Sequence, residues 1–321
     1  MKLRSGLRGL FDMYDSIIIF GATATGKTSI AIKVAQMLNT EIINADSMYI
    51  YHDLNIGTAK PTKQEMNGIK HHLIDIAQVN DNFNVSNFRA HSIPIINDFK
   101  HRELIPIVVG GTGLYINSLI TNYSYGNNSH SDELRKQLTN ELNLYGKEYL
   151  YNKLFKLDPI IAQTLHVNDV SRVIRAIEIK TLSGISKANI VNNHSPLLKN
   201  PLLIGLTMPR EILYEKINKR VDIMIANGLI DEVKSIYSRG LNPDNCQSLK
   251  GIGYKEIIDY FDGKYTLDDA IEKIKQHTRN YAKRQITWFK RYNNVNWFDT
   301  NNDHNIENKI IQLFNKKDTT F

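Results

Sequence analysis

The 321-residue chain contains one cysteine, Cys246, so it cannot form an intrachain disulfide. Proteins without disulfides are typical of a reducing cytosol, and the sequence therefore predicts a cytoplasmic protein. No flanking pattern indicates an activated thiol, and we expect Cys246 to be a buried side chain without a catalytic role.

Long apolar runs are also absent. A bilayer span needs about 18 consecutive apolar residues, and no such run occurs, so we expect no membrane segment. The nearest candidate, residues 105–120, contains Pro106 and three glycines within residues 110–113, which is typical of a buried strand that ends in a functional turn. Residues 1–15 show no small-residue cleavage site, and we expect them to lie on the core rather than act as a targeting peptide.

The composition is that of an ordinary globular chain. Hydrophobic residues make up 42% and charged residues 23%, which is enough to build a sizeable core. No internal repeat occurs, and the length favours two lobes. Forty Lys and Arg against 33 Asp and Glu give a net charge of +7, which attracts polyanions wherever the basic residues gather on one surface.

Short continuous apolar runs predict strands that are buried on both faces of a parallel sheet. Such runs occupy residues 16–20, 41–45, 105–109 and 201–207, and apolar residues at helical spacing follow the first run over residues 28–38. Strands that alternate with helices indicate an α/β core with a doubly wound parallel sheet, whose ligands bind beyond the carboxyl ends of the strands.

From residue 122 to residue 199 the pattern is helical, and we expect a helical insertion domain there. Residues 1–121 and 200–321 then form the core. Residues 186–200, at the end of the insertion, are polar and rich in Asn, as linkers are. A long final helix is predicted over residues 267–292.

A glycine-rich loop joins the first strand to the first helix and fits the P-loop pattern G-x-x-x-x-G-K-[ST]. It consists of Gly21, Ala22, Thr23, Ala24, Thr25, Gly26, Lys27 and Thr28. Glycines let backbone N–H groups surround phosphate oxygens, Lys27 supplies a positive charge, and Thr28 can ligate Mg²⁺. The loop predicts a bound phosphate chain, but it does not show whether a phosphoryl group is transferred or leaves.

Asp46, followed by Ser47, ends the second predicted strand and should face the same crevice. A carboxylate there can act as a general base, orient a substrate or metal, or cap backbone N–H groups, and its position alone does not decide among these roles. His71 and His72 are adjacent on an extended segment, where successive side chains point to opposite sides. That arrangement favours a structural or substrate-gating role over a shared metal.

Two arginines of the insertion lie on one helix face. Arg172 and Arg175 are three positions apart, and Glu178 follows one turn later. This spacing indicates either a solvated, salt-bridged face or a binding surface.

The final helix combines basic and aromatic side chains. Its basic residues are Lys275, Arg279, Lys283, Arg284, Lys290 and Arg291, and the aromatic residues among them are Trp288, Phe289 and Tyr292. Charge with stacking suits a nucleic-acid surface. The alternative is an aromatic seam that faces the core, with basic side chains reaching past it to solvent.

Ordered blocks extend from the phosphate loop to the final helix. They are residues 21–28, 44–49, 53–61, 72–76, 108–115, 251–255 and 282–288. Many NTPases share the phosphate loop, but the Asp-Ser, Gly-Gly-Thr and Lys-Arg-Gln blocks in this order are specific. Over nearly its whole length the chain resembles the bacterial tRNA dimethylallyltransferases, also called tRNA isopentenyltransferases. Ala22 stands where that family usually has proline.

The resemblance implies transfer of a dimethylallyl group from dimethylallyl diphosphate to N6 of the adenosine 3′-adjacent to the anticodon, with release of diphosphate. It implies that Asp46 is the general base, that Thr23 and Lys27 take part in catalysis, and that the phosphate loop and Arg220 bind the diphosphate. Residues implied to contact the tRNA anticodon stem-loop are Asp46, Ser47, Met48, Tyr49, Thr112, Arg135, Ser171, Arg172, Arg175, Lys250, Gly253, Tyr254, Lys255, Lys283, Arg284 and Gln285. We expect a monomer that uses Mg²⁺.

Two other functions fit part of the sequence. A P-loop kinase of a small metabolite or nucleotide would use the loop but leave the basic, aromatic final helix without a role. An RNA-binding ATP switch would use the charge but leave Asp46 and the Gly-Gly-Thr turn unexplained. On the favoured interpretation ATP binds weakly at most and is not cleaved.

Overall fold

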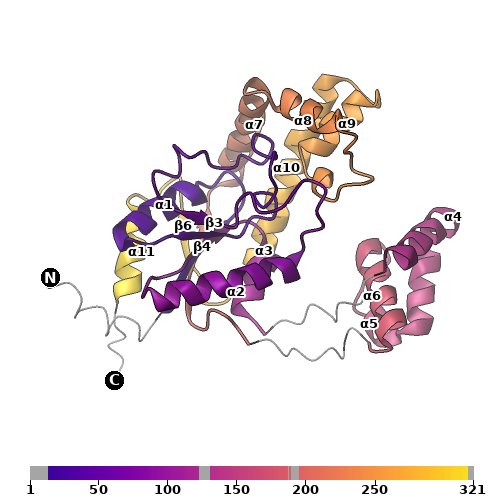
Figure 1. Ribbon diagram of the computed structural model, residues 1–321, viewed down its shortest axis with the longest axis horizontal. Coiled ribbons are helices and arrows are strands. Elements are labelled where there is room, and N and C mark those ends of the chain that lie inside the picture. Colours follow the sequence, from indigo (N-terminus) through magenta and orange to yellow (C-terminus); the bar gives the residue numbers. More distant parts are fainter. Residues whose placement is uncertain (1–13, 123–130, 187, 189–194, 317–321) are drawn as a thin grey trace. The chain divides into compact units, whose positions relative to one another are not determined.

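The computed structural model describes residues 14–122, 131–186, 188 and 195–316, which fall into two compact units (Figure 1). The larger unit comprises residues 1–120 and 197–321, and the smaller one residues 121–196. Residues 1–13 of the predicted N-terminal segment and residues 187 and 189–194 of the predicted linker lie outside the described residues.

A six-stranded sheet forms the centre of the larger unit, in the order β3-β2-β4-β1-β5-β6. Its strands are β1 Ser16–Gly21, β2 Ile42–Asn44, β3 His71–His72, β4 Ile107–Gly110, β5 Pro201–Thr207 and β6 Asn296–Asp299. All five strand pairings are parallel. The predicted α/β fold with a doubly wound parallel sheet is therefore confirmed, and two short edge strands, β3 and β6, are added to it.

Strand β1 lies in the middle of the sheet and is buried on both faces. Ile18 pairs with Val108 of β4 on one side and with Leu203 of β5 on the other. Because side chains alternate along a strand, Ile18 contributes to one hydrophobic core and Ile17 to the other. This double burial explains why the apolar run is continuous rather than alternating.

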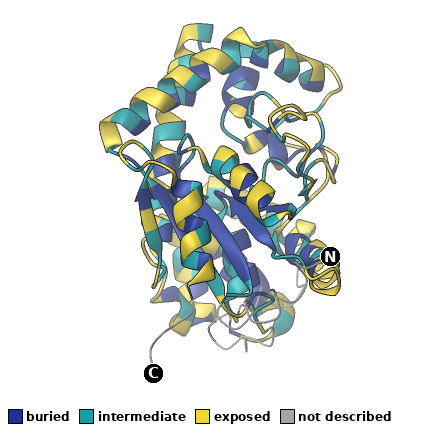
Figure 2. Ribbon diagram, turned by 90° about the vertical axis from the view of Figure 1, so that its left-hand side faces the viewer, coloured by how far each residue is buried: buried dark blue, intermediate teal, exposed yellow. Residues whose placement is uncertain are grey.

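Helices cover both faces of the sheet, which appears in Figure 2 as a dark layer between them. They are α1 Lys27–Leu38, α2 Val85–His101, α3 Gly113–Ile120, α7 Arg210–Ala226, α8 Leu229–Tyr237, α9 Tyr254–Phe261, α10 Leu267–Phe289 and α11 Ile306–Asn315, with a 3₁₀ turn at Ser248–Lys250. The predicted final helix is thus present and ends three residues earlier than expected.

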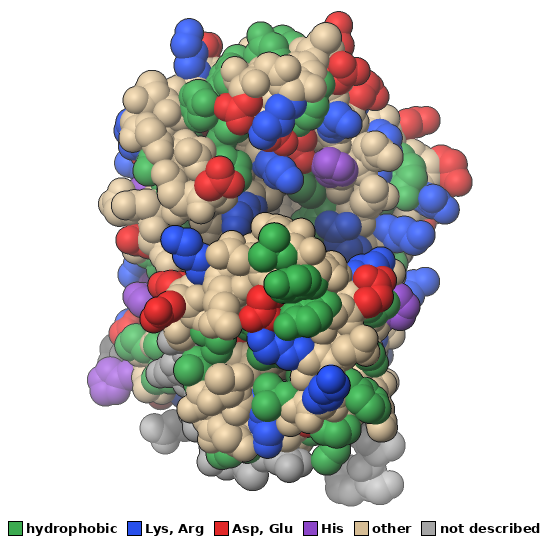
Figure 3. Space-filling view, turned by 90° about the vertical axis from the view of Figure 1, so that its right-hand side faces the viewer, with side chains coloured by type: hydrophobic (Ala, Val, Ile, Leu, Met, Phe, Trp, Pro, Cys, Tyr) green, Lys and Arg blue, Asp and Glu red, His purple; other side chains and the backbone are tan. Residues whose placement is uncertain are grey.

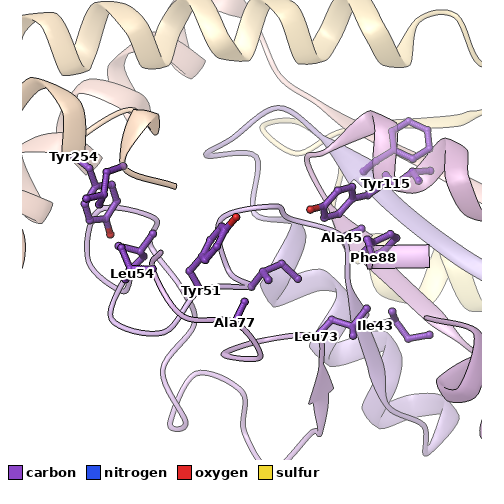
Figure 4. Packing of buried hydrophobic residues seen from close by; sticks show 14 of the residues in the cluster. Ile43, Ala45, Tyr51, Leu54, Leu73, Ala77, Phe88, Tyr115 and Tyr254 are labelled. Atoms are coloured by element: carbon purple, nitrogen blue, oxygen red, sulfur yellow. The ribbon is translucent and has the colours of Figure 1, made fainter. Parts of the chain in front are cut away.

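The smaller of the two cores packs α1 and α11 against one face of the sheet, and the larger packs α2, α3 and helices α7 to α10 against the other. In the larger core Phe88 of α2 stacks on Tyr115 of α3 with ring centroids 4.1 Å apart, next to Ile43 and Ala45 (Figure 4). Helix α10 joins this core through Phe289, whose ring stacks on Phe20 of β1 at 4.6 Å. Cys246 is buried there, as predicted.

The described part of the smaller unit consists of α4 Asp132–Leu157, α5 Pro159–Ala162 and α6 Val170–Ser183. Gly146 breaks α4 into two arms with a left-handed φ of 82°. A core of Leu138, Leu150, Leu154 and residues of α6 holds the arms together. No strand occurs among its described residues, in line with the helical pattern of the sequence. Several apolar side chains of this unit remain exposed, among them Leu144 and Ile160. Figure 3 shows hydrophobic side chains between charged ones on one face of the protein.

Backbone hydrogen bonds join the two segments of the larger unit at the point where the smaller unit is inserted. The N–H groups of Leu197 and Leu198 both donate to the carbonyl of Leu119, at 2.8 and 3.0 Å. The chain therefore leaves the core at the end of α3 and re-enters it beside the same residue.

We predict that Phe289→Ala lowers the free energy of unfolding by about 3–5 kcal/mol, because it opens a cavity between α10 and β1. Met37→Ala, on the exposed side of α1, should change it by less than about 0.5 kcal/mol. Chemical denaturation followed by circular dichroism measures both values. Equal effects of the two substitutions would contradict the packing of α10 on the sheet.

Candidate active site

A cavity of about 630 Å³ lies at the carboxyl ends of the central strands, within the larger unit. Its size falls within the range usual for small-molecule sites. It is lined by the phosphate loop, by residues 46–49, by residues 57–59 and 61, and by one face each of α7 and α10. The sequence predicted a site at these strand ends, and the structure brings the segments together there.

The phosphate loop leaves β1 at Gly21 and enters α1 at Gly26, which has a left-handed φ of 78°. Ala22 holds the loop in shape, since its carbonyl accepts the Lys27 ammonium at 2.7 Å and the Thr25 hydroxyl at 2.8 Å. Thr23, Lys27 and Thr28 line the cavity, whereas Thr25 is buried. The loop thus presents its backbone and the start of α1 to the cavity.

Asp46 follows β2 and faces the loop across the cavity. Its Oδ1 accepts the N–H of Met48 at 3.0 Å, and its own N–H donates to Asn44 at 3.0 Å. Burial raises the pKa of Asp46, although the Met48 hydrogen bond and the charge of Lys27 oppose the rise. Asp46 therefore accepts a hydrogen bond from the backbone and also places in the cavity a carboxylate whose pKa is raised.

Lys27 and Arg220 complete a charged group around Asp46. The pKa of Lys27 is lowered to about 8, chiefly by burial; the charge of Asp46 opposes this effect and that of Arg220 adds to it. Arg220, on α7, donates to the Thr23 hydroxyl at 3.4 Å. Two cations and one carboxylate at one cavity favour an anionic ligand, whose charge would offset the burial of the Lys27 ammonium.

Gln285 of α10 connects the loop to the Gly-Gly-Thr turn. Its Oε1 accepts the N–H of Thr23 at 2.9 Å, and its Nε2 donates to the carbonyl of Gly111 at 3.0 Å. A Cβ on Gly111 would overlap that Nε2, which explains the glycine. Gln285 is only 5% exposed, and it lines the cavity with its amide held by these two hydrogen bonds. Its contact with RNA stays a prediction.

Other residues predicted to contact tRNA are divided between the cavity and the surface. Ser47, Met48, Tyr49, Lys250 and Arg284 line the cavity, and Thr112 lies behind it, accepting the N–H of Ser47 at 3.0 Å. Lys283 and Lys255 are exposed. Tyr254 is fully buried, so its side chain offers no surface to RNA in this structure.

Helix α10 shows features of both interpretations that its sequence allowed, a basic surface and an aromatic seam facing the core. Phe289 is buried in the core, while Lys283, Arg284 and Lys290 are exposed. Lys275 binds Asp222 at 2.9 Å and so belongs to a surface ion pair with α7. The helix therefore has a core-facing aromatic seam and a basic outer face.

In the smaller unit Glu178 holds two arginines. Arg135 reaches it through two hydrogen bonds of 3.0 Å, and Arg175 through one of 2.5 Å. Burial alone raises the pKa of Glu178, but these hydrogen bonds lower it to about 2. Arg172 binds Asp169 at 3.4 Å and is exposed beside Ser171. The salt-bridged face is therefore present, around a carboxylate that is buried rather than solvated.

The two histidines separate as predicted. His71 lines the cavity and hydrogen-bonds the carbonyl of Ile69 at 2.9 Å, whereas His72 binds Glu41 at 2.6 Å. Among the residues that the structure describes, no group of three His, Cys, Asp or Glu is placed to hold a metal ion.

Several apolar lining residues were not predicted. They are Ile217, Val221 and Met224 on α7, together with Ile252. The signal for the α7 set is present in the sequence, because positions 217, 221 and 224 share one face of a helix with Arg220.

Known proteins match the chain over most of its length. A family model described as IPP transferase matches residues 49–292. A tRNA dimethylallyltransferase of Clostridioides difficile is 47% identical over 303 residues, which cover 92% of this chain and 96% of that protein. The chain belongs to the IPP transferase family. It is therefore an enzyme and a transferase, and the family predicted from the sequence is confirmed.

Solved structures agree with this assignment. The full-length tRNA isopentenylpyrophosphate transferase of Bacillus halodurans is 43% identical with a TM-score of 0.68, and the match covers 94% of this chain and 95% of that one. A eukaryotic dimethylallyltransferase acting on tRNA is 33% identical with a TM-score of 0.75, over 89% of this chain and 73% of that one.

The lowered pKa of Lys27 predicts a pH dependence of anion binding. A folded-state pKa of about 8 means that the ammonium loses its proton as pH rises through that value. The affinity for inorganic diphosphate should therefore fall by about tenfold between pH 7 and roughly pH 9. Calorimetric titration of the wild-type protein and of Lys27→Met measures this, with the variant correcting for ionisation of the ligand. Parallel pH profiles would rule out Lys27 as the titrating group.

Proposed function

We propose that this enzyme transfers a dimethylallyl group from dimethylallyl diphosphate to the exocyclic N6 amine of the adenosine 3′-adjacent to the anticodon in tRNA, and releases diphosphate. The observation that carries the proposal is the cavity in which a phosphate loop and the Asp46 carboxylate lie together. The names of the related proteins support the choice of donor and acceptor.

The cavity suits both halves of the donor. Backbone N–H groups of the loop, Lys27 and Arg220 would bind the diphosphate. Ile217, Val221 and Met224 offer an apolar wall for the prenyl group. A loop of this type holds any diphosphate through its backbone, so the groups opposite it decide the chemistry. Here that group is Asp46, and the sequence has no recognised motif that binds a nucleobase or positions a water, so we propose that ATP is at most a weak and unproductive ligand.

Asp46 is the proposed base. The exocyclic amine of adenine is a weak nucleophile because its lone pair is delocalised into the ring, so a carboxylate that accepts its proton during attack assists the reaction. Burial raises the pKa of Asp46, which makes it a better proton acceptor than an exposed carboxylate.

The reaction also requires diphosphate to leave. Negative charge grows on the leaving oxygen as the carbon–oxygen bond breaks, while the allylic carbon tolerates positive charge. Lys27 and the loop N–H groups meet that charge, and Thr23 and Arg220 lie beside them.

Mg²⁺ is proposed as the metal. Thr28 lies in the first turn of α1 and lines the cavity, so its hydroxyl could ligate the ion. A single protein oxygen fits an ion that is held mainly by the donor's phosphates and water. The ion would add positive charge beside the leaving group.

The acceptor is proposed to be the anticodon stem-loop. Positive charge for a phosphate backbone is provided by exposed Lys283 and Arg284 on α10 and by exposed Lys255 on α9. In the smaller unit the exposed Arg172 does so, and the neighbouring Ser171 offers a hydroxyl for hydrogen bonding. The target base must leave its stack to reach the donor, at a cost of a few kcal/mol that RNA contacts would offset.

We further propose a cytoplasmic monomer. No helix among the described residues is long and apolar enough to cross a membrane. The lone, buried Cys246 agrees with a reducing compartment.

Product analysis tests the proposal. The protein is incubated with tRNA and Mg²⁺, and with either labelled dimethylallyl diphosphate or labelled ATP. We expect prenylated adenosine and intact diphosphate in the first reaction and no cleavage in the second. ATP cleavage coupled to tRNA without any prenylated adenosine would instead support an ATP-dependent enzyme.

We predict that Asp46→Asn lowers the single-turnover rate by about 10²–10⁴-fold, because asparagine keeps the hydrogen bond from Met48 but cannot accept the proton. Affinity for tRNA should change little. Asp98→Asn, on the exposed part of α2, is the matched control and should keep wild-type turnover. A near-normal rate for the Asp46 variant would remove this residue from the base role.

A further inference from the structure

The segment from Asp53 to Pro61 forms one wall of the cavity through residues 57–59 and 61. It contains turns but neither helix nor strand, so sheet or helix ladders do not satisfy its backbone N–H groups. Three successive groups, those of Asn55, Ile56 and Gly57, point instead at one side chain on a distant helix.

That side chain is Glu232 of α8. Its Oε2 accepts the N–H groups of Asn55 at 3.1 Å and Ile56 at 2.8 Å, and its Oε1 accepts that of Gly57 at 3.1 Å. Converging N–H groups of this kind form a small anion site, and here a carboxylate of the protein itself fills it. The cavity wall is thereby fixed to α8.

A fourth donor binds the same carboxylate. The hydroxyl of the fully buried Tyr254 donates to Glu232 Oε1 at 2.7 Å. Burial and the Glu232 charge raise the pKa of Tyr254, so the hydroxyl keeps its proton. A Cβ on Gly57 would lie 2.7 Å from the Tyr254 ring, so only glycine fits there. Figure 4 shows Tyr254 packed beside Leu54 at this end of the core.

The far end of the segment reaches the charged groups of the cavity. The carbonyl of Ala59 accepts the Tyr49 hydroxyl at 2.8 Å and Arg220 Nη2 at 3.5 Å. Arg220 Nη1 in turn donates to the Thr23 hydroxyl of the phosphate loop at 3.4 Å. The position of Arg220 therefore depends on where the segment lies.

We infer that Glu232 is a positioning residue for the donor site: it holds the segment 53–61 in place and, through Ala59, sets Arg220 against the phosphate loop. The inference rests on the proposed function, because it takes dimethylallyl diphosphate as the ligand that Arg220 meets. Glu232 is not among the residues that line the cavity, so it acts through the segment.

Glu232→Gln is the decisive variant. It keeps the size of the side chain but replaces one acceptor oxygen with an NH₂ group, which then faces N–H donors. We expect the KM for dimethylallyl diphosphate to rise about tenfold, in line with loss of a charge-assisted hydrogen-bond set, while affinity for tRNA changes by less than about twofold.

Two further variants bracket this result. Tyr254→Phe removes one of the four donors and leaves the carboxylate in place, so the donor KM should rise by less than about threefold. Glu215→Gln removes an exposed carboxylate of α7 and should leave the donor KM unchanged. Thermal melting of each variant reports on the fold.

An unchanged donor KM in Glu232→Gln would overturn the inference. So would equal losses of donor affinity, tRNA affinity and thermal midpoint, because these indicate support of the fold alone. Calorimetry with inorganic diphosphate separates the inference from the proposed function. If the variant binds diphosphate about tenfold more weakly than wild type, yet the wild type transfers no prenyl group, the positioning role stands and the proposed function fails.

Discussion

Gln285 joins three parts of the chain that are distant in sequence. It accepts a hydrogen bond from Thr23, 262 positions earlier, and donates one to Gly111, 174 positions earlier. Its amide is buried, and a lost partner would leave a polar group unsatisfied, so the phosphate loop, the turn after β4 and α10 hold one another in place. The exposed basic residues Lys283 and Arg284 precede it directly. The phosphate loop and the basic face of α10 are therefore parts of one rigid arrangement.

The charges of the cavity depend on this arrangement. Lys27, Arg220 and Asp46 are brought together by β1, β2 and α7. The charges of Asp46 and Arg220 act on the pKa of Lys27, and those of Lys27 and Arg220 act on the pKa of Asp46. Burial weakens the hold of Lys27 on its proton and strengthens that of Asp46. An anion bound at the loop would reverse the first effect by restoring a partner for the ammonium. In the proposed reaction, the same pair of groups meets the departing diphosphate and the proton of the amine.

Sequence patterns predicted the parts of the structure whose cause is local. The strands buried on both faces were found because Ile17 to Phe20 and their counterparts are continuous apolar runs, whereas edge strand β3 is two histidines and carries no such signal. The phosphate loop and Asp46 were found because they follow strand ends. The sequence did not reveal the internal role of Gln285 or the four hydrogen bonds of Glu232, because the partners of these side chains lie far away in sequence. Tyr254 belongs to a block that indicated RNA contact, but the fold buries it.

The paired hydrogen bonds at Leu119 place the exit and the re-entry of the inserted unit at one point of the core. For the stability of the larger unit, residues 121–196 thus act as a loop whose two ends are held together by backbone hydrogen bonds. The entropy of closing such a loop grows only with the logarithm of its length, so each doubling costs about 0.6 kcal/mol. The inserted unit can therefore lengthen, shorten or be exchanged over evolutionary time with little thermodynamic effect on the sheet.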